Sequence, residues 1–300
     1  GPSDRPRRRT RCPSGRRVIL AFFGGIYGAG IGGATSFILF GFMAIIGIAV
    51  IVGGGSPDFL NSVALSPIFG PQAAFIGGFA AAAFTAKLSR DGKLLNADGT
   101  QAEEFIGANI FAPLAPYKNI SILLVGGVFG VIGTALLVLL DEIIGLSADN
   151  IGVAVFLGGF IVRLVFGDAE IMSNLPAEAN KGAMVTENLA YNVLWAFSLS
   201  VVMGSVMQVI DFPLFGFVVG AFGLIFIAAG VVTFPMIHHI AFISALAGSV
   251  TGNIWIAGIF GVLALILGDF FGVFFNANAK SHIDPPAGAI AILSLIILTF

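Results

Sequence analysis

Two adjacent histidines, His238 and His239, are the residues of this sequence best suited to chemistry. The chain holds three histidines, and these two lie inside an apolar region of the C-terminal half. Imidazoles in such a region line a pore, shuttle protons, bind a metal ion or serve as hydrogen-bonded core residues. Neighbouring helical residues point about 100° apart. Because no cysteine or further histidine is close in the sequence, we expect no metal site.

Two charged residues also lie inside apolar runs. Asp269 belongs to the run 254–275, where a carboxylate costs roughly 2.5–3.5 kcal/mol on insertion scales. It is a candidate for gating or proton coupling, unless it reaches the membrane surface. Apart from Lys87 at the edge of the expected span 72–88, Arg163 is the only basic residue within an expected span. It either pairs with a carboxylate such as Asp141 or Glu142 or extends to the interface.

Prolines and uncharged polar residues interrupt the apolar sequence at two places, residues 57–70 and 234–252. Backbone that is not helical at membrane depth is tolerated only where protein buries it or where it lines a cavity. We therefore expect two re-entrant half-helices whose tips form a solute site. The polar residues at the two breaks are Asn61, Ser62, Ser66, Gln72, Thr233 and Asn253. They suit substrate binding or gating for a polar or weakly charged solute.

The composition shows which elements carry these residues. The 300 residues are 57% hydrophobic and 10% charged, whereas a soluble domain carries roughly 25% charged residues. A helix needs about 20 apolar residues to cross the hydrocarbon layer, and such runs recur along the chain. The sequence predicts an all-α polytopic membrane protein with about 9–10 transmembrane helices. The expected spans are 18–33, 35–54, 72–88, 119–140, 151–166, 191–210, 213–233, 254–275 and 285–300.

The chain reads as two similar halves. Residues 37–42, Phe-Ile-Leu-Phe-Gly-Phe, return at 212–217 as Phe-Pro-Leu-Phe-Gly-Phe, and a broken segment follows each copy. A second, weaker match pairs 72–77 with 253–258. Two similar membrane halves are typical of transporters and channels whose site lies between the halves.

The expected organisation follows from these matches. A first membrane repeat covers 18–140, a joining span and polar loop cover 141–190, and a second repeat covers 191–300. Four spans and one joining span make an odd number of crossings. The second repeat therefore enters from the opposite side, which predicts an inverted-topology repeat.

Residues 1–17 carry seven arginines and are expected to be a disordered basic tail. Gly1-Pro2 resembles the scar left by a tag-removing protease. The positive-inside rule places this end in the cytoplasm, in a bacterial-type inner or plasma membrane. The lipid bilayer is the expected partner of the helices, and nucleic acid is not an expected partner. Small residues on many helices also make a homo-oligomer plausible.

Asp284, followed by two prolines, is the expected N-cap of the last span. The stretch 284–289, Asp-Pro-Pro-Ala-Gly-Ala, resembles the His-Pro-Pro-Ala-Gly-Ala signature of the HPP membrane family, with aspartate in place of histidine. Segment 66–78, with its Ser-Pro, a further proline and Gly-Gly, resembles another piece of that signature. The plan of repeated helices with two re-entrant segments is similar to that of urea channels, without their motif residues. Neither resemblance assigns the chain to a family.

These features predict an integral membrane transporter for a small polar or anionic solute or ion. The site lies near the bilayer midplane, with His238, His239 and Asp269 as candidates for gating or proton coupling. A passive channel is the first alternative, and a membrane-embedded enzyme or subunit of a membrane complex is the second. No hydrolase, nucleotide-binding or zinc motif is present in the sequence, so we expect neither enzyme activity nor a cofactor.

Overall fold

The structure is a computed structural model that describes residues 14–167, 188–277 and 279–299. These residues form α-helices joined by loops and by short π and 3-10 turns, and they contain no β-strand. The expected all-α class is confirmed. The helices are α1 (Ser14–Ile31), α2 (Gly33–Val52), α3 (Ala74–Arg90), α4 (Ile120–Val138), α5 (Asn150–Phe166), α6 (Leu189–Ile210), α7 (Leu214–Gly223), α8 (Ile225–Ala228), α9 (His238–Thr251), α10 (Ile254–Phe271) and α11 (Pro285–Thr299).

Four helical segments are long and apolar enough to cross a membrane, by length and composition. Large apolar side chains also cover the outside of the described structure. Val209, for example, is 84% exposed. A soluble protein rarely leaves this much apolar surface in water, so the surface is compatible with an integral membrane protein. The four segments are Gly33–Val52, Ile120–Ile144, Leu189–Ile210 and Ile254–Asn276.

The first three-helix bundle consists of α1, α3 and α4, each of which packs against the other two. The three helices meet at Gly25, Gly77 and Gly126. A Cβ atom added to Gly77 would lie 2.5 Å from the Gly25 Cα and 2.6 Å from the Gly126 carbonyl oxygen. Only glycine permits this approach, so the glycine-rich sequence here serves close helix packing.

A second bundle consists of α6, α9 and α10, and these helices also pack pairwise. They meet at Gly204, Gly248 and Ala257. A Cβ atom added to Gly248 would lie 2.8 Å from the Gly204 Cα and 3.5 Å from the Ala257 Cβ. The second bundle therefore repeats the small-residue contact of the first, with slightly more room.

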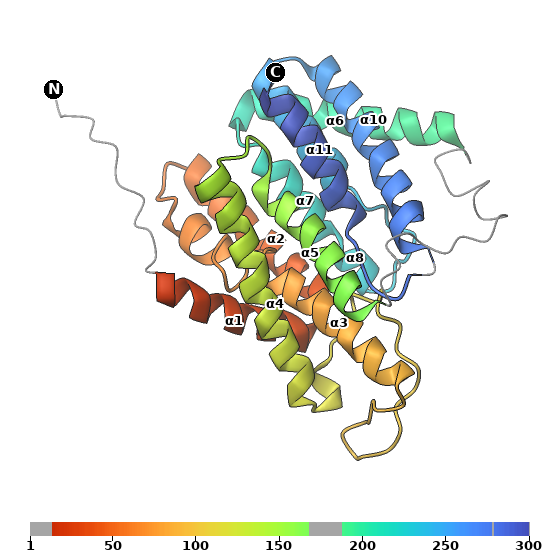
Figure 1. Ribbon diagram of the computed structural model, residues 1–300. Coiled ribbons are helices and arrows are strands. Elements are labelled where there is room, and N and C mark those ends of the chain that lie inside the picture. The colour runs from red at the N-terminus through yellow and green to blue at the C-terminus, as the bar shows by residue number, and fades with distance from the viewer. Residues whose placement is uncertain (1–13, 168–187, 278, 300) are drawn as a thin grey trace.

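Two pairs of helices join the bundles: α2 packs against α7, and α5 packs against α11 (Figure 1). On the first pair, the rings of Phe37 and Phe217 lie 5.4 Å apart. On the second pair, the backbone N–H of Asp149 donates to the Ser294 hydroxyl at 2.8 Å. The two matching stretches thus lie where the N-terminal and C-terminal halves meet. They are residues 37–42 in α2 and residues 212–217, which run into α7.

The two expected broken segments have different forms. Residues 53–73 are largely non-helical, apart from the π turn Leu60–Ala64. In the second half the break is shorter: regular helix is interrupted between Ala228 and His238, and α9 then runs unbroken to Thr251. The prediction of a break over 234–252 was therefore too long. Its small and polar residues, such as Ser244, are buried helix-packing residues whose hydroxyl groups bond to the preceding turn.

The N-terminal boundary also differs from the prediction. Helix α1 begins at Ser14, so the last residues of the predicted tail are helical. Arg17 in its first turn binds the Glu142 carboxylate, with Nη1 and Oε1 2.5 Å apart. Most of the predicted tail, and most of the polar loop expected at 167–190, lie outside the described residues.

Candidate functional site

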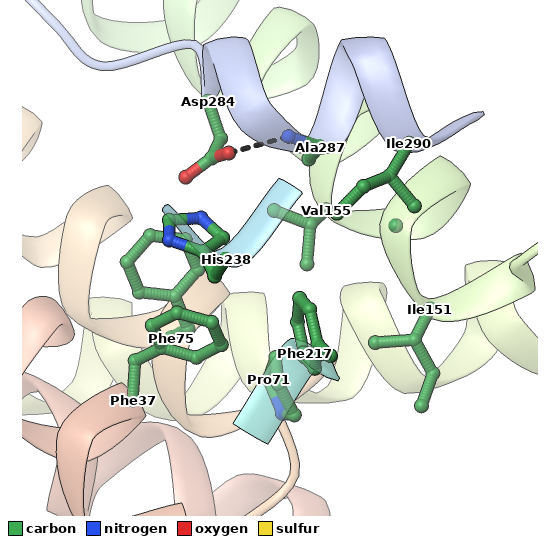
Figure 2. Close-up of a pocket in the computed structure, with 11 residues that line it drawn as sticks. Phe37, Pro71, Phe75, Ile151, Val155, Phe217, His238, Asp284, Ala287 and Ile290 are labelled. Carbon is green, nitrogen blue, oxygen red and sulfur yellow. Dashed lines mark hydrogen bonds between the residues drawn. The ribbon is translucent and has the colours of Figure 1, made fainter. Parts of the chain in front are cut away.

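A small pocket with a cavity volume of about 20 Å³ lies where the two halves meet. Its walls come from helices of both halves and from the loop before α11, and Figure 2 shows the imidazole of His238 and the carboxylate of Asp284 in it. The lining is mostly apolar, and its polar side chains are these two. The eleven lining residues are Phe37, Pro71, Phe75, Ile151, Gly152, Val155, Phe217, His238, Asp284, Ala287 and Ile290.

Asp284 caps the N-terminus of α11 and is only 8% exposed. Its Oδ1 accepts a hydrogen bond of 2.7 Å from the backbone N–H of Ala287, which Figure 2 shows as a dashed line. Its Oδ2 lies 3.3 Å from the Nε2 atom of His282. The capping role that the sequence predicted for Asp284 is thus confirmed. Capping leaves room for more partners, because each carboxylate oxygen accepts two hydrogen bonds.

His238 is the first residue of α9 and is 4% exposed. Its ring packs edge-on against Phe37 at 5.3 Å and Phe217 at 6.0 Å. Its Nδ1 atom is buried and has no hydrogen-bond partner in the described structure. Burying a polar atom without a partner is costly. The imidazole of His238, which lines the pocket, thus has hydrogen-bonding capacity that the described residues do not use.

A buried loop carries Asp284 to the pocket and places His282 beside it. Between α10 and α11 the chain forms a π turn, Gly272–Asn276, and then an extended segment in which Ser281 and Ile283 are fully buried. The side-chain amide of Asn276 donates to the Ile283 carbonyl at 2.7 Å and accepts from the Ile283 N–H at 3.0 Å. The Asn276 side chain thus supplies hydrogen bonds that water would otherwise make to the backbone of this loop.

Arg163 of α5 holds the same loop from the other side. It is 2% exposed and donates to the Phe275 carbonyl at 2.6 Å and the Ser281 carbonyl at 2.6 Å. It also contacts the Ser281 hydroxyl at 3.1 Å and the Asn276 Oδ1 at 3.3 Å. The guanidinium fork satisfies several carbonyls at once, as its rigid set of donors allows.

The predicted pairing of Arg163 with Asp141 or Glu142 is wrong. Asp141 accepts from the Asn150 side chain at 3.3 Å, and Glu142 binds Arg17. The physical reason is distance along α5. Arg163 lies near its C-terminal end, about 20 Å from the N-terminal end at a rise of 1.5 Å per residue.

The structure places His238, His239 and Asp269 in different surroundings. His238 lines the pocket, whereas the neighbouring His239 points toward α10, where a Cβ on Gly268 would lie 2.6 Å from its Nε2 atom. Both ring nitrogens of His239 are buried without a partner in the described residues. Asp269 is half-buried on α10 and does not line the pocket.

The uncharged polar residues predicted for the site lie outside the pocket. Asn61, Ser62 and Thr233 are exposed, and the exposed Asn253 caps α10 by accepting from the Trp255 N–H at 2.9 Å. Gln72 and Ser66 are buried beside the first break. There the Gln72 amide donates to the Leu65 carbonyl at 3.4 Å and the Ser66 hydroxyl accepts from the Ile68 N–H at 3.3 Å. They support the backbone of the break.

Sequence reasoning missed His282 as a site residue and gave Asp284 only a capping role. The available signal was their spacing: a histidine two residues before an aspartate that begins a helix. Within the described part of the chain, no group of three or more histidine, cysteine or acidic residues is arranged to hold a metal ion.

The chain belongs to a family of unknown function, DUF7973, whose model matches residues 12–179 and 190–300. No curated protein and no solved structure matched the chain. Membership therefore leaves the activity to be argued from the site.

Proposed function

We propose that this protein is an integral membrane transporter for a small polar solute, and that the pocket at His238 and Asp284 is its solute site. One observation carries the proposal. A buried carboxylate and a buried imidazole, whose Nδ1 atom has no partner, line one small cavity between two packed halves. Ionisable groups at membrane depth are costly and mark solute or proton pathways, and sites at the junction of two halves are typical of transporters.

Matched packing supports two repeats, here placed at 14–166 and 189–299. Helices α1, α3 and α4 pack as α6, α9 and α10 do, and α5 relates to α3 and α4 as α11 relates to α9 and α10. On this basis α5 belongs to the first repeat instead of joining the two. Five helices per repeat, each crossing once, bring the second repeat in from the opposite side, so the proposed topology remains inverted.

The start of α4 supports the same correspondence. Residues 119–122 read Asn-Ile-Ser-Ile and residues 253–256 read Asn-Ile-Trp-Ile. Each asparagine caps its helix, Asn119 by accepting from the Ser121 N–H at 2.9 Å and Asn253 from the Trp255 N–H at 2.9 Å. This pairing of α4 with α10 replaces the weaker match of 72–77 with 253–258.

A passive channel of the same build is the second candidate. Proton coupling separates the two, because a titratable group that faces the solute favours a coupled transporter. The site offers Asp284, His238 and His282 for that role. This arrangement favours the transporter over a channel with an uncharged pore.

Flux measurements in proteoliposomes test the proposal. The solute panel contains small cations, anions and neutral molecules, each measured with and without an imposed pH gradient. We expect one solute class to accumulate against its gradient, and His238→Ala to abolish this accumulation while His239→Ala reduces it less. Downhill flux that ignores the pH gradient would identify a channel. Equal losses in the two histidine variants would contradict the assignment of the site to the pocket.

A further inference from the structure

The charge of the pocket lining restricts the class of solute. Asp284 is the only lining residue with a formal charge when histidines are neutral, and no lysine or arginine is among the eleven residues. An anion would enter a small cavity that already holds a carboxylate and offers no cationic side chain. Like charges repel strongly where water is scarce, so the lining disfavours an anion.

The end of α9 does not reverse this balance. A helix N-terminus attracts anions through its free N–H groups. Here α7 closely covers the first residue of α9: a Cβ on Gly220 would lie 2.6 Å from the His238 backbone nitrogen and 2.3 Å from its Cα. The N-terminus of α11 is occupied by its own cap, Asp284. Neither helix end is therefore an open anion site.

The polar side chains that line the pocket, Asp284 and His238, offer hydrogen-bond acceptors. The Asp284 carboxylate accepts only, and the buried Nδ1 of His238 has no partner and accepts when the proton is on Nε2. Metal cations such as Na⁺ or Ca²⁺ require several oxygen ligands, and Asp284 is the only carboxylate in the lining. A cation with N–H donors fits these acceptors better.

The apolar part of the wall suits the same ligand. Phe37, Phe75 and Phe217 line the pocket beside His238, and aromatic faces attract ammonium groups. The cavity volume of about 20 Å³ is slightly more than a single water molecule requires. It admits a ligand of few heavy atoms.

We propose that the solute is a small protonated amine of the ammonium or methylammonium class, bound between Asp284, the imidazole of His238 and the phenylalanine wall. The inference rests on the proposed function and names its substrate class. Asp284 supplies the negative charge, His238 accepts one N–H, and the aromatic rings replace water around the remainder of the cation.

Uptake of radiolabelled methylammonium into proteoliposomes at pH 6 tests the inference, with protein-free liposomes as the background. We expect saturable uptake that ammonium inhibits and formate does not. Asp284→Asn should lower uptake at least tenfold, because the amide keeps an oxygen to cap α11 but loses the charge. The matched control is Asp269→Asn, which removes the half-buried carboxylate outside the pocket and should keep uptake within about twofold.

A second variant tests the inference even if Asp284→Asn fails to fold. Phe217→Leu conserves an apolar wall and removes one ring, and it should raise the KM for methylammonium about threefold to tenfold. If formate or urea is transported instead, and Asp284→Asn stops that flux, the proposed transporter stands and the amine class is overturned. Flux of none of these probes would overturn both.

Discussion

The two loops that precede α5 and α11 have similar local structures in different surroundings. Each begins with a π turn, Leu139–Ile144 or Gly272–Asn276. Each ends in an aspartate that caps the next helix: Asp149 Oδ2 accepts from the Gly152 N–H at 2.8 Å, and Asp284 Oδ1 accepts from the Ala287 N–H at 2.7 Å.

The surroundings of these loops differ. The first loop is largely exposed, with Ile143 72% exposed, and it reaches the pocket only where Asp149 caps the turn that holds Ile151 and Gly152. The second loop is buried against Arg163, and its Asp284 lies beside His282 and lines the pocket with His238. We infer from this comparison that the aspartate cap belongs to the fold and that burial makes only the second copy a candidate site. The scaffold is shared by the two halves, and the candidate chemistry belongs to the second loop alone.

The largest expected effect comes from replacing Arg163, whose guanidinium binds backbone carbonyls of the buried second loop. Arg163→Met leaves the carbonyls of Phe275 and Ser281 without these donors, and it should destabilise the protein by about 3 kcal/mol or more. Arg17→Met removes the more exposed Arg17–Glu142 pair near the first loop and should cost at most about 1 kcal/mol. Thermal unfolding in detergent measures both, and equal shifts would contradict the difference in burial.

Alanine at the glycine contacts tests the similarity of the two bundles. Gly77→Ala forces a Cβ onto backbone atoms at 2.5 and 2.6 Å, while Gly248→Ala meets its nearest atoms at 2.8 and 3.5 Å. We expect a loss of about 2–3 kcal/mol for the first and about 1 kcal/mol for the second, as for overpacked interiors. The order of the two unfolding temperatures checks the prediction, and a larger effect at Gly248 would contradict the packing.

Substituting each cap by alanine separates structure from function. Asp149→Ala and Asp284→Ala each remove one side-chain cap and should cost about 0.5–2 kcal/mol of stability. Unfolding curves should therefore shift by similar amounts. Transport activity should disappear only in Asp284→Ala, and its loss in both variants would indicate that the caps act through folding.

The smallest effects are expected at the exposed caps of α4 and α10. Asn119→Ala and Asn253→Ala each remove hydrogen bonds to the first turn, with an expected cost of about 0.5–1 kcal/mol. Transport should be unaffected by either change, since Asn253 lies outside the pocket. A loss of flux in Asn253→Ala but not in Asn119→Ala would indicate that Asn253 belongs to the solute site.

Local patterns were sufficient to predict most of the fold. Apolar runs of membrane length placed the helices other than α9 within about five residues of their observed ends, since burial and length dominate such segments. The cap at Asp284 followed from aspartate before two prolines. The predicted end of the second break was wrong because the small and polar residues within α9 serve close helix packing. Composition alone does not distinguish such packing residues from a break.

Long-range contacts explain why the site could be predicted only in part. His238, which its rarity and apolar surroundings singled out, lines the pocket. The position of Asp284 and His282 depends on Arg163, which bonds Ser281 across 118 residues of sequence. No local pattern encodes that contact. Asp269 was favoured because it is a carboxylate in an apolar run, but hydropathy does not show which side of a helix faces the pocket.

The most direct test of the central claim compares one substitution at the two equivalent caps. Asp149→Asn and Asp284→Asn each keep an oxygen that can accept from the capped N–H and remove one charge. Solute flux in proteoliposomes, at matched protein content and with a panel of amines, anions and neutral solutes, should persist in Asp149→Asn and fall at least tenfold in Asp284→Asn. Equal flux in the two variants would contradict the assignment of the solute site to the buried loop.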